Sequence, residues 1–387
     1  MKAKVLLGFV FSFILPSYSV FACTVFYAAN DTIALAGSNK DWISAESYVW
    51  FCPPEKNKYG RIYLGFDLFL DQKEPSGGIN DQGLFFEMVY ASDLEFKNDI
   101  TGESYRGNIL EKILEECSSV EEVLDLLKKY NNLQYYANHY IMFGDKQGNS
   151  VIIKLGQIFE YNSQFQILPF KDESPCDQYL ITYNTLNNNS SNLSVGLFKK
   201  ILSNVHVEGT MGYGTTVYST IYDLKNGQIH LYYFHNFMEE VIFNIEDELK
   251  KGFRTLKIVS LFPKNIAAED YIDQKNMELK QRIESRWAKN ISIEDFVKVE
   301  GEFRSLDTFS KDRFRIMLEN KKLYITVNND SKFELYPESS SKFFIPSVSG
   351  DFSLTFLKDD PDNSLKVLVE YESKFFKGIQ QTFQKIN

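Results

Sequence analysis

Cys23 has the clearest potential for chemistry, because the residues before it have the form of a removable leader. Residues 1–22 begin with two lysines, continue with an apolar run over residues 5–15 and end in Val20-Phe21-Ala22. This pattern is typical of a secretory signal peptide. Cleavage after Ala22 makes Cys23 the first residue of the mature chain, so that one residue carries both a thiol and a free α-amine. That amine is a built-in base for the thiol nucleophile.

Two other interpretations of Cys23 stay open. Val20-Phe21-Ala22-Cys23 is also similar to a lipoprotein cleavage box, in which the sulfur carries a diacylglycerol and serves only as an anchor. A leader that is cut elsewhere leaves Cys23 as an ordinary buried thiol. The apolar run is about 11 residues long, whereas a membrane-spanning helix needs roughly 20. We therefore expect no permanent membrane span.

Composition argues against two classes of partner. The chain has 387 residues and a net charge of −10, and the loss of the two leader lysines makes that charge more negative still. Nucleic acids and anionic membranes both require a basic surface, so neither is an expected partner. Four cysteines are too few for a disulfide scaffold. Whether Cys52 pairs with Cys176 stays open, and Cys117 is expected to be a buried thiol.

The histidines do not indicate a metal site. The chain contains no Cys-x-x-Cys pair, and His139, His206, His230 and His235 do not form a cluster in the sequence. We therefore expect neither a metal nor a cofactor. His206 is expected to have a structural role, although it could also line a substrate site.

The elements next to Cys23 predict a hairpin. Residues 24–27 and 33–37 have the composition of two strands around a turn at Asn30-Asp31, and this hairpin returns Asp41 towards Cys23. Asn226-Gly227 predicts a second hairpin turn. Further strands are expected at residues 61–70, 83–90, 139–143, 150–155, 217–222 and 228–234, and helices at residues 108–116, 120–130 and 245–251.

The C-terminal part has a different pattern. Residues 263–290 are charged and predict a connecting helix. Beyond them, apolar residues alternate with a period of two between polar turns, which predicts a small antiparallel barrel or sandwich. The predicted organisation is a signal peptide over residues 1–22, a catalytic domain over 23–262, a helical linker over 263–295 and a β-rich accessory domain over 296–387.

Four blocks of sequence, taken in order, resemble the N-terminal-nucleophile cysteine amidases. This group includes choloylglycine hydrolases, penicillin V acylases, isopenicillin N acyltransferases and carcinine hydrolases. The resemblance covers about residues 23–262. The blocks are Cys23-Thr24-Val25-Phe26 with Gly37-Ser38-Asn39-Lys40-Asp41-Trp42, then Gly78-Ile79-Asn80-Asp81-Gln82-Gly83-Leu84, which runs on to Tyr90, then Leu180-Ile181-Thr182-Tyr183-Asn184, and finally Gly214-Thr215-Thr216-Val217-Tyr218-Ser219.

The resemblance implies an α/β protein with a four-layer αββα N-terminal-nucleophile hydrolase domain, followed by the small C-terminal antiparallel β domain. It implies that Cys23 is the nucleophile and its own amine the base. Asp41 matches the residue that fixes the amine and the thiol. The backbone N–H of Tyr90 and the side-chain amide of Asn184 match the oxyanion hole, where the loss of one donor typically costs roughly 10²–10³ in rate.

The chain departs from the family at two arginines. Ser38 stands where bile-salt and penicillin V members carry arginine, and no arginine lies between Arg106 and Arg254, where those members carry a second. The absence of both guanidinium groups argues against bile-salt hydrolysis. Lys40 could replace one of them, but we expect it to lie in an exposed turn. The segment after Asn184 resembles the acyltransferase and carcinine-hydrolase branch more closely.

The sequence therefore predicts an exported cysteine amidase, periplasmic or extracellular, that acts on a small molecule. It would hydrolyse linear, non-peptide or N-acyl C–N amide bonds through a thioester on Cys23. Two alternatives stay open: an acyltransferase that passes the acyl group to an amine, and a lipid-anchored binding protein without enzymatic activity. The residues do not indicate the acyl group, the amine or the oligomeric state.

Overall fold

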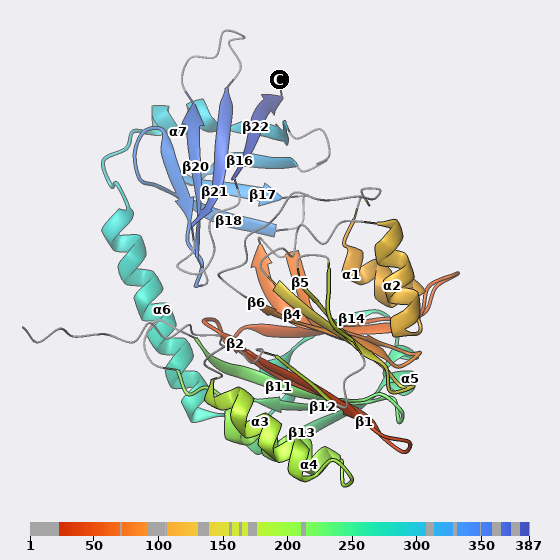
Figure 1. Cartoon of the computed structure of the whole chain (residues 1–387). Coiled ribbons are helices and arrows are strands. Elements are labelled where there is room, and N and C mark those ends of the chain that lie inside the picture. The colour runs from red at the N-terminus through yellow and green to blue at the C-terminus, as the bar shows by residue number, and fades with distance from the viewer. Residues whose placement is uncertain are drawn as a thin grey trace, which may run out of the picture.

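The computed structural model places most of the chain in two large sheets and a C-terminal barrel (Figure 1). The expected signal peptide over residues 1–22 lies outside the residues that the structure describes. The described residues are 23–69, 72–90, 105, 107–130, 139–154, 157–161, 165–168, 176–209, 214–306, 313–327, 331–348, 350–357, 365–372 and 380–386.

A six-stranded antiparallel sheet holds Cys23 at the start of an interior strand. The hairpin of β1 (Thr24–Ala29) and β2 (Ala34–Trp42) is the predicted one: the Asn30 side chain accepts hydrogen bonds from the backbone of Thr32 and Ile33, and Thr24 pairs with Asn39. The Asn226-Gly227 turn is also confirmed, between β11 (Thr215–Asp223) and β12 (Gln228–Tyr233). The strand order is β10 (Phe165–Leu168), β1 (Thr24–Ala29), β2 (Ala34–Trp42), β11 (Thr215–Asp223), β12 (Gln228–Tyr233) and β13 (Asn236–Asn244).

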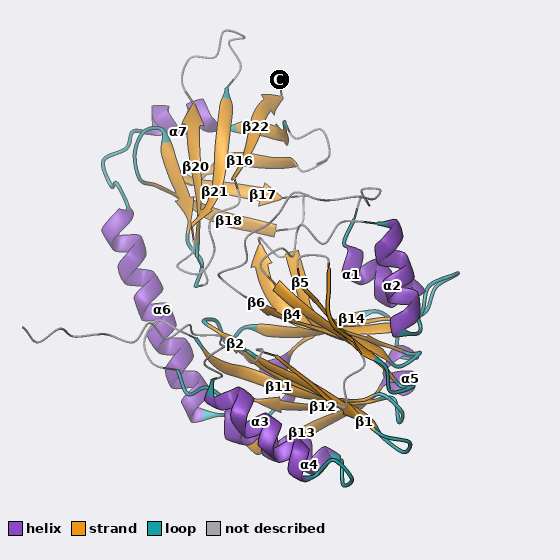
Figure 2. Ribbon diagram, viewed as in Figure 1, coloured by secondary structure: helices purple, strands orange, loops and turns teal. Residues whose placement is uncertain are grey.

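An eight-stranded sheet lies over the first one (Figure 2). Apolar side chains of both sheets form one shared core, which includes Val25 and Tyr27 of β1 and Val49 and Ile62 of the larger sheet. The order in the larger sheet is β14 (Arg254–Lys257), β3 (Ser47–Cys52), β4 (Arg61–Phe69), β5 (Gln72–Asn80), β6 (Leu84–Tyr90), β7 (His139–Asp145), β8 (Ser150–Lys154) and β9 (Gln157–Tyr161).

Helices cover the outer faces of these two sheets (Figure 1). α1 (Ile109–Glu116) and α2 (Val120–Lys129) bury their apolar stripes against the eight-stranded sheet, and the side chains of Asn108 and Ser119 cap their first turns. α3 (Asp177–Asn188) and α4 (Val195–Val205) pack against the six-stranded sheet. The side chains that point outward from β1 and β2 therefore meet α3 and α4, and those that point inward meet the other sheet.

The C-terminal part confirms a small antiparallel β domain, and of the two predicted forms it is the barrel. The predicted connecting helix is observed as α6 (Ile266–Arg286), which follows α5 (Ile245–Leu249) and a 3₁₀ turn at Ile258–Leu261. α7 (Ile293–Val299) leads into the closed barrel, whose strands are β15 (Gly301–Ser305), β16 (Arg313–Glu319), β17 (Lys322–Val327), β18 (Ser331–Pro337), β19 (Lys342–Ile345), β20 (Asp351–Leu357), β21 (Lys366–Glu372) and β22 (Gln380–Ile386).

The last turn of α6 is fixed to the barrel by charge. Arg286 contacts Glu338 at 3.1 Å and Asp351 at 2.6 Å, and Asp351 also pairs with Arg282 at 3.0 Å. In Figure 1, α6 runs from the two sheets to the barrel. The exact domain boundaries given above stay predictions. None of the described helices has both the length and the hydropathy needed to cross a membrane.

Candidate active site

Cys23 lies directly before β1 and is partly buried against the core between the sheets. Its Sγ donates a weak hydrogen bond to the backbone carbonyl oxygen of Asp41, at 3.7 Å. Burial, and after it the Asp41 carboxylate, raise the pKa of the Cys23 thiol to about 12. The thiolate is the nucleophilic form of cysteine, so this environment keeps the sulfur unreactive at neutral pH.

Asp41 is held beside Cys23 by the neighbouring strand. Its side chain is 5% exposed, and its Oδ1 accepts a hydrogen bond from the hydroxyl of Thr216 on β11. Its Oδ2 is buried and has no hydrogen-bond donor among the described residues. Burial raises the pKa of this carboxyl group well above its usual range. A buried carboxylate oxygen without a donor is unfavourable, so this position suits a cationic donor.

A buried ion pair, Lys40–Glu87, lies next to these two residues and joins the two sheets. Lys40 comes from β2 and Glu87 from β6, and their side chains are 2% and 0% exposed. Glu87 also accepts a hydrogen bond from the hydroxyl of Tyr222 at 2.8 Å. The Lys40 charge lowers the pKa of the Cys23 thiol and so opposes the effect of burial. The expectation that Lys40 lies in an exposed turn is therefore wrong.

Lys40 also donates hydrogen bonds to two backbone carbonyl oxygens at the point where two strands of the larger sheet separate. β5 and β6 are paired as far as Gly77 and Glu87. The carbonyl oxygens one residue beyond this pair, those of Ser76 and Met88, accept hydrogen bonds from Lys40 Nζ at 2.9 and 2.8 Å. The ammonium group thus replaces the missing strand pairing, which explains why a lysine is buried at this position.

Tyr218 completes this group of buried polar side chains. Its hydroxyl lies 3.0 Å from Ser76 Oγ, and its ring is fully buried. Burial, and then the charges of Glu87 and Cys23, raise the pKa of Tyr218. The Cys23 thiol therefore lies near the Lys40–Glu87 pair and two phenols, those of Tyr218 and Tyr222, with the Asp41 carboxyl group as a further close charge.

Tyr90 is the last residue of β6, two residues after Met88. It pairs with His139 of β7, and the two rings lie edge to face with centroids 5.5 Å apart. Burial, and after it the Lys40 charge, lower the pKa of His139 to about 4. Tyr90 thus lies at the end of β6 that faces Lys40. The oxyanion role of its backbone N–H stays a prediction.

The structure does not bring Asn184 to Cys23. Asn184 lies on α3 and is exposed to solvent. α3 packs on the outer face of the six-stranded sheet, whereas Cys23 packs against the core on the inner face. The sheet itself therefore separates the two side chains. In this structure the Asn184 amide is not placed to complete an oxyanion hole around the Cys23 sulfur.

The buried pair of Lys40 and Glu87 is not predicted from the sequence, although the sequence contains one signal for it. Glu87 interrupts the apolar run of β6, where an unpaired carboxylate is unfavourable, so a buried cationic partner is required.

All four cysteines are free thiols in the structure, so Cys52 and Cys176 are not paired. Cys117 is buried, as expected.

Three polar side chains from two separate segments of the sequence also come together near Thr216. His206 and Glu208 follow α4, and His235 lies in the turn between β12 and β13. Burial is the main cause that lowers the pKa of His235 to about 4, and the neighbouring His206 contributes. Nothing in the sequence spacing indicates that His235 lies near His206 and Glu208.

One family model matches part of the chain. Residues 55–158 match the family of linear amide C–N hydrolases, choloylglycine hydrolase family. This segment includes β4 to β8, with Glu87 and Tyr90, and the helices α1 and α2. Comparison with curated proteins gives no match.

Three solved structures are similar to the chain. A mutant of the conjugated bile acid hydrolase from Clostridium perfringens has 17% sequence identity and a TM-score of 0.44, and the match covers 63% of this chain and 97% of that one. Another variant of that hydrolase has 19% sequence identity and a TM-score of 0.46, and the match covers 61% of this chain and 97% of that one. Penicillin V acylase from Agrobacterium tumefaciens has 14% sequence identity and a TM-score of 0.44, and the match covers 61% of this chain and 91% of that one. The family match over residues 55–158 confirms the resemblance to this family for that part of the chain, which contains the block from Gly78 to Tyr90.

Proposed function

We propose that this protein is an exported amidase that hydrolyses linear C–N amide bonds of a small molecule, with Cys23 as its N-terminal nucleophile. The family match supports amide hydrolysis. The observation that carries the role of Cys23 is the buried Oδ2 of Asp41, which has no donor among the described residues. Removal of residues 1–22 creates an α-ammonium group on the residue that already contacts Asp41. We also propose that the two sheets and their helices form an αββα N-terminal-nucleophile hydrolase domain.

In the proposed reaction, the α-amine of Cys23 takes the thiol proton and the thiolate attacks the amide carbonyl carbon. The resulting α-ammonium group donates its proton to the amide nitrogen, the C–N bond breaks, and the amine product leaves. The acyl group remains on the sulfur as a thioester. The α-amine then takes a proton from water as the water attacks the thioester, and the carboxylic acid and the free thiol are released.

Asp41 acts in this scheme on the amine and not directly on the sulfur. Its negative charge raises the pKa of the thiol, so by itself it disfavours the thiolate. Its Oδ2 can instead accept a hydrogen bond from the α-ammonium group and hold that group against Cys23. The hydroxyl of Thr216 fixes the other carboxylate oxygen. Asp41 is therefore proposed to orient the base.

Lys40 is proposed to supply positive charge close to the nucleophile. Ser38 and Lys40 alternate along β2, so they lie on the same face of the strand. Ser38 occupies the position where related hydrolases carry arginine, and the Lys40 charge lowers the pKa of the Cys23 thiol. Because Glu87 pairs with Lys40, the ammonium group stays buried and fixed in position.

The test begins with the N-terminus of the exported protein. Intact mass is measured first, and we expect a chain that begins at unmodified Cys23. A mass increase equal to a diacylglycerol would instead indicate the lipid-anchored protein, and a different first residue would contradict the mechanism.

Turnover is then measured on N-acyl amino acids, penicillin V and conjugated bile salts. Cys23→Ala is expected to fold and to lose activity, while the control Cys176→Ala is expected to keep it. Cys176 is also a free thiol, and its side chain makes no capping hydrogen bond at the start of α3. Full activity in Cys23→Ala contradicts the proposal. Added amines that divert the thioester into new amides would identify an acyltransferase.

A further inference from the structure

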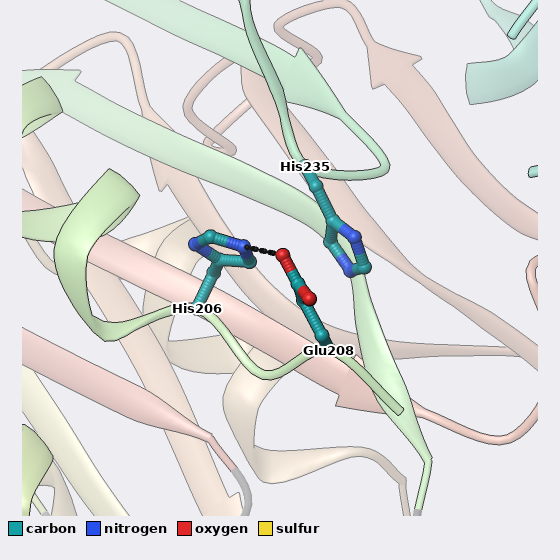
Figure 3. Close-up of side chains that lie close together, drawn as sticks. All are labelled: His206, Glu208 and His235. Carbon is teal, nitrogen blue, oxygen red and sulfur yellow. Dashed lines mark hydrogen bonds and ion pairs between the residues drawn. The ribbon is translucent and has the colours of Figure 1, made fainter. Parts of the chain in front are cut away.

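Three side chains able to ligate a metal ion meet at one end of the six-stranded sheet (Figure 3). One ligand atom from each of His206, Glu208 and His235 lies within 4.8 Å of the other two. His206 Nε2 and Glu208 Oε1 are 3.4 Å apart, and the centroids of the two imidazole rings are 4.9 Å apart. We propose that these three residues bind one divalent transition-metal ion of the zinc type. This site is separate from the Cys23 chemistry.

The donor set and its spacing fit such an ion. Two imidazoles and one carboxylate are the ligands that zinc and its neighbours in the first transition row bind well. In a tetrahedral site with metal–ligand bonds of about 2.0–2.1 Å, the ligand atoms lie roughly 3.3 Å apart. The pair His206–Glu208 already has this separation. The Glu208 side chain is 82% exposed, so its carboxylate can rotate towards the ion at little cost.

Backbone hydrogen bonds set the orientation of His206. Its Nδ1 lies 2.7 Å from the carbonyl oxygen of Ser203. A carbonyl oxygen only accepts hydrogen bonds, so Nδ1 carries a proton, and in the neutral ring Nε2 has its lone pair on the side of Glu208. Metal-ligating histidines in proteins usually have this arrangement, in which the second ring nitrogen donates to a fixed acceptor.

The backbone around the three residues is also fixed before any ion binds. Between His206 and Gly209, the chain is joined to β11 by hydrogen bonds from Val207 N to Thr216 Oγ1 at 2.8 Å and from Thr216 N to Val207 O at 2.9 Å. Thr215 Oγ1 donates to Val207 O at 2.9 Å and lies 2.8 Å from His235 Nε2. One threonine thus contacts both sides of the cluster, which lowers the entropy cost of bringing the ligands together.

The charge at the site is appropriate for a divalent cation. With both imidazoles neutral, the carboxylate gives the cluster a single negative charge. An ion here would add a further link between the segment after α4 and β11, next to the Thr216 that contacts Asp41. The proposed amide hydrolysis uses no metal, so the ion is assigned a structural role. Water would complete its coordination on the exposed side.

The test is a titration of the full-length protein with Zn²⁺, followed by calorimetry and by thermal unfolding. We expect one saturable ion per chain and an increase in melting temperature. His206→Ala and His235→Ala are each expected to weaken binding more than about 100-fold, because they remove a ligand and not merely an outer-shell partner. Thr215→Val is expected to weaken it by roughly 10- to 100-fold. His230→Gln is the matched control, since His230 pairs with Glu240 at 3.1 Å outside the cluster.

Free thiols also bind zinc, so the titration is repeated on Cys23→Ser, Cys52→Ser and Cys176→Ser. The proposal holds if binding persists in these three variants and is lost in the two histidine variants. It is overturned if no saturable binding occurs, or if the two histidine variants bind as the unmodified protein does. Amide hydrolysis is not a readout here, so a negative result leaves the proposed function unaffected.

Discussion

Replacement of Lys40 by methionine tests whether the buried ion pair of Lys40 and Glu87 stabilises the fold. Methionine fills most of the same space but carries no charge, so Glu87 is left buried without its cation. Both side chains are at most 2% exposed in the structure. Removing one partner of a buried pair typically costs about 3–5 kcal/mol in the free energy of unfolding. The carbonyl oxygens of Ser76 and Met88 also lose their donor.

The loss of folding stability in Lys40→Met is expected to depend on pH. Burial raises the pKa of Glu87 already in the presence of Lys40, and the loss of the cation raises it further. A carboxyl group whose pKa is higher in the folded than in the unfolded state stabilises the fold at low pH, and this contribution is lost as pH rises through the folded value. Between pH 7 and pH 5, the deficit relative to the unmodified protein should therefore shrink by up to about 2.7 kcal/mol, which is about 1.36 kcal/mol per unit.

Urea denaturation, followed by tryptophan fluorescence, measures this effect. A Trp287→Phe background restricts the signal to Trp42 and Trp50, which lie on β2 and β3. The double variant Lys40→Met/Glu87→Gln is expected to be more stable than the sum of the two single losses predicts, by more than about 1 kcal/mol. Additivity within about 0.5 kcal/mol, or a deficit that does not change with pH, would show that the pair is not coupled as described.

Three further outcomes are expected. Gly77→Ala should destabilise the sheets by about 1–3 kcal/mol in urea denaturation, because a Cβ there would lie 2.2 Å from Glu87 Oε1; an unchanged midpoint contradicts this packing. In the uncleaved chain at pH 8, iodoacetamide should alkylate Cys23 about 10³-fold more slowly in the folded protein than in the protein unfolded by urea. The reason is that the pKa of the Cys23 thiol is about 12 in the fold, against about 8.5 for a free thiol. Equal alkylation rates, measured by mass spectrometry, contradict this prediction. Thr216→Val should cost about 1.5–3 kcal/mol by removing the hydrogen bond to Asp41, and Thr216→Ser should recover most of it.

Local patterns were sufficient to predict the elements whose signals are short-range. The turn at Asn30-Asp31, the turn at Asn226-Gly227 and the charged helix that became α6 all depend on residues that are close together in the sequence. The alternating strands of the C-terminal part predicted antiparallel structure, but their closure into a barrel depends on the pairing of β15 with β22, which are distant in the chain.

The candidate site was predicted less completely, because tertiary contacts decide which side chains meet. The return of β2 along β1 brings Asp41 to Cys23, which a hairpin prediction can anticipate. Lys40 looked like an exposed lysine because nothing near it in the sequence indicates the carboxylate of Glu87 on the other sheet. Asn184 was assigned from a short motif, and the helix that carries it packs on the opposite face of the sheet.

The closed barrel has a further consequence for how this chain is built. Its apolar core draws on α7 and on the barrel strands, and among the described residues no side chain from the two large sheets belongs to it. Each described barrel strand is paired on both sides, so the described strands leave no open edge for another strand to join. A unit with a core of its own can be gained, lost or exchanged during evolution without repacking the sheets that hold Cys23.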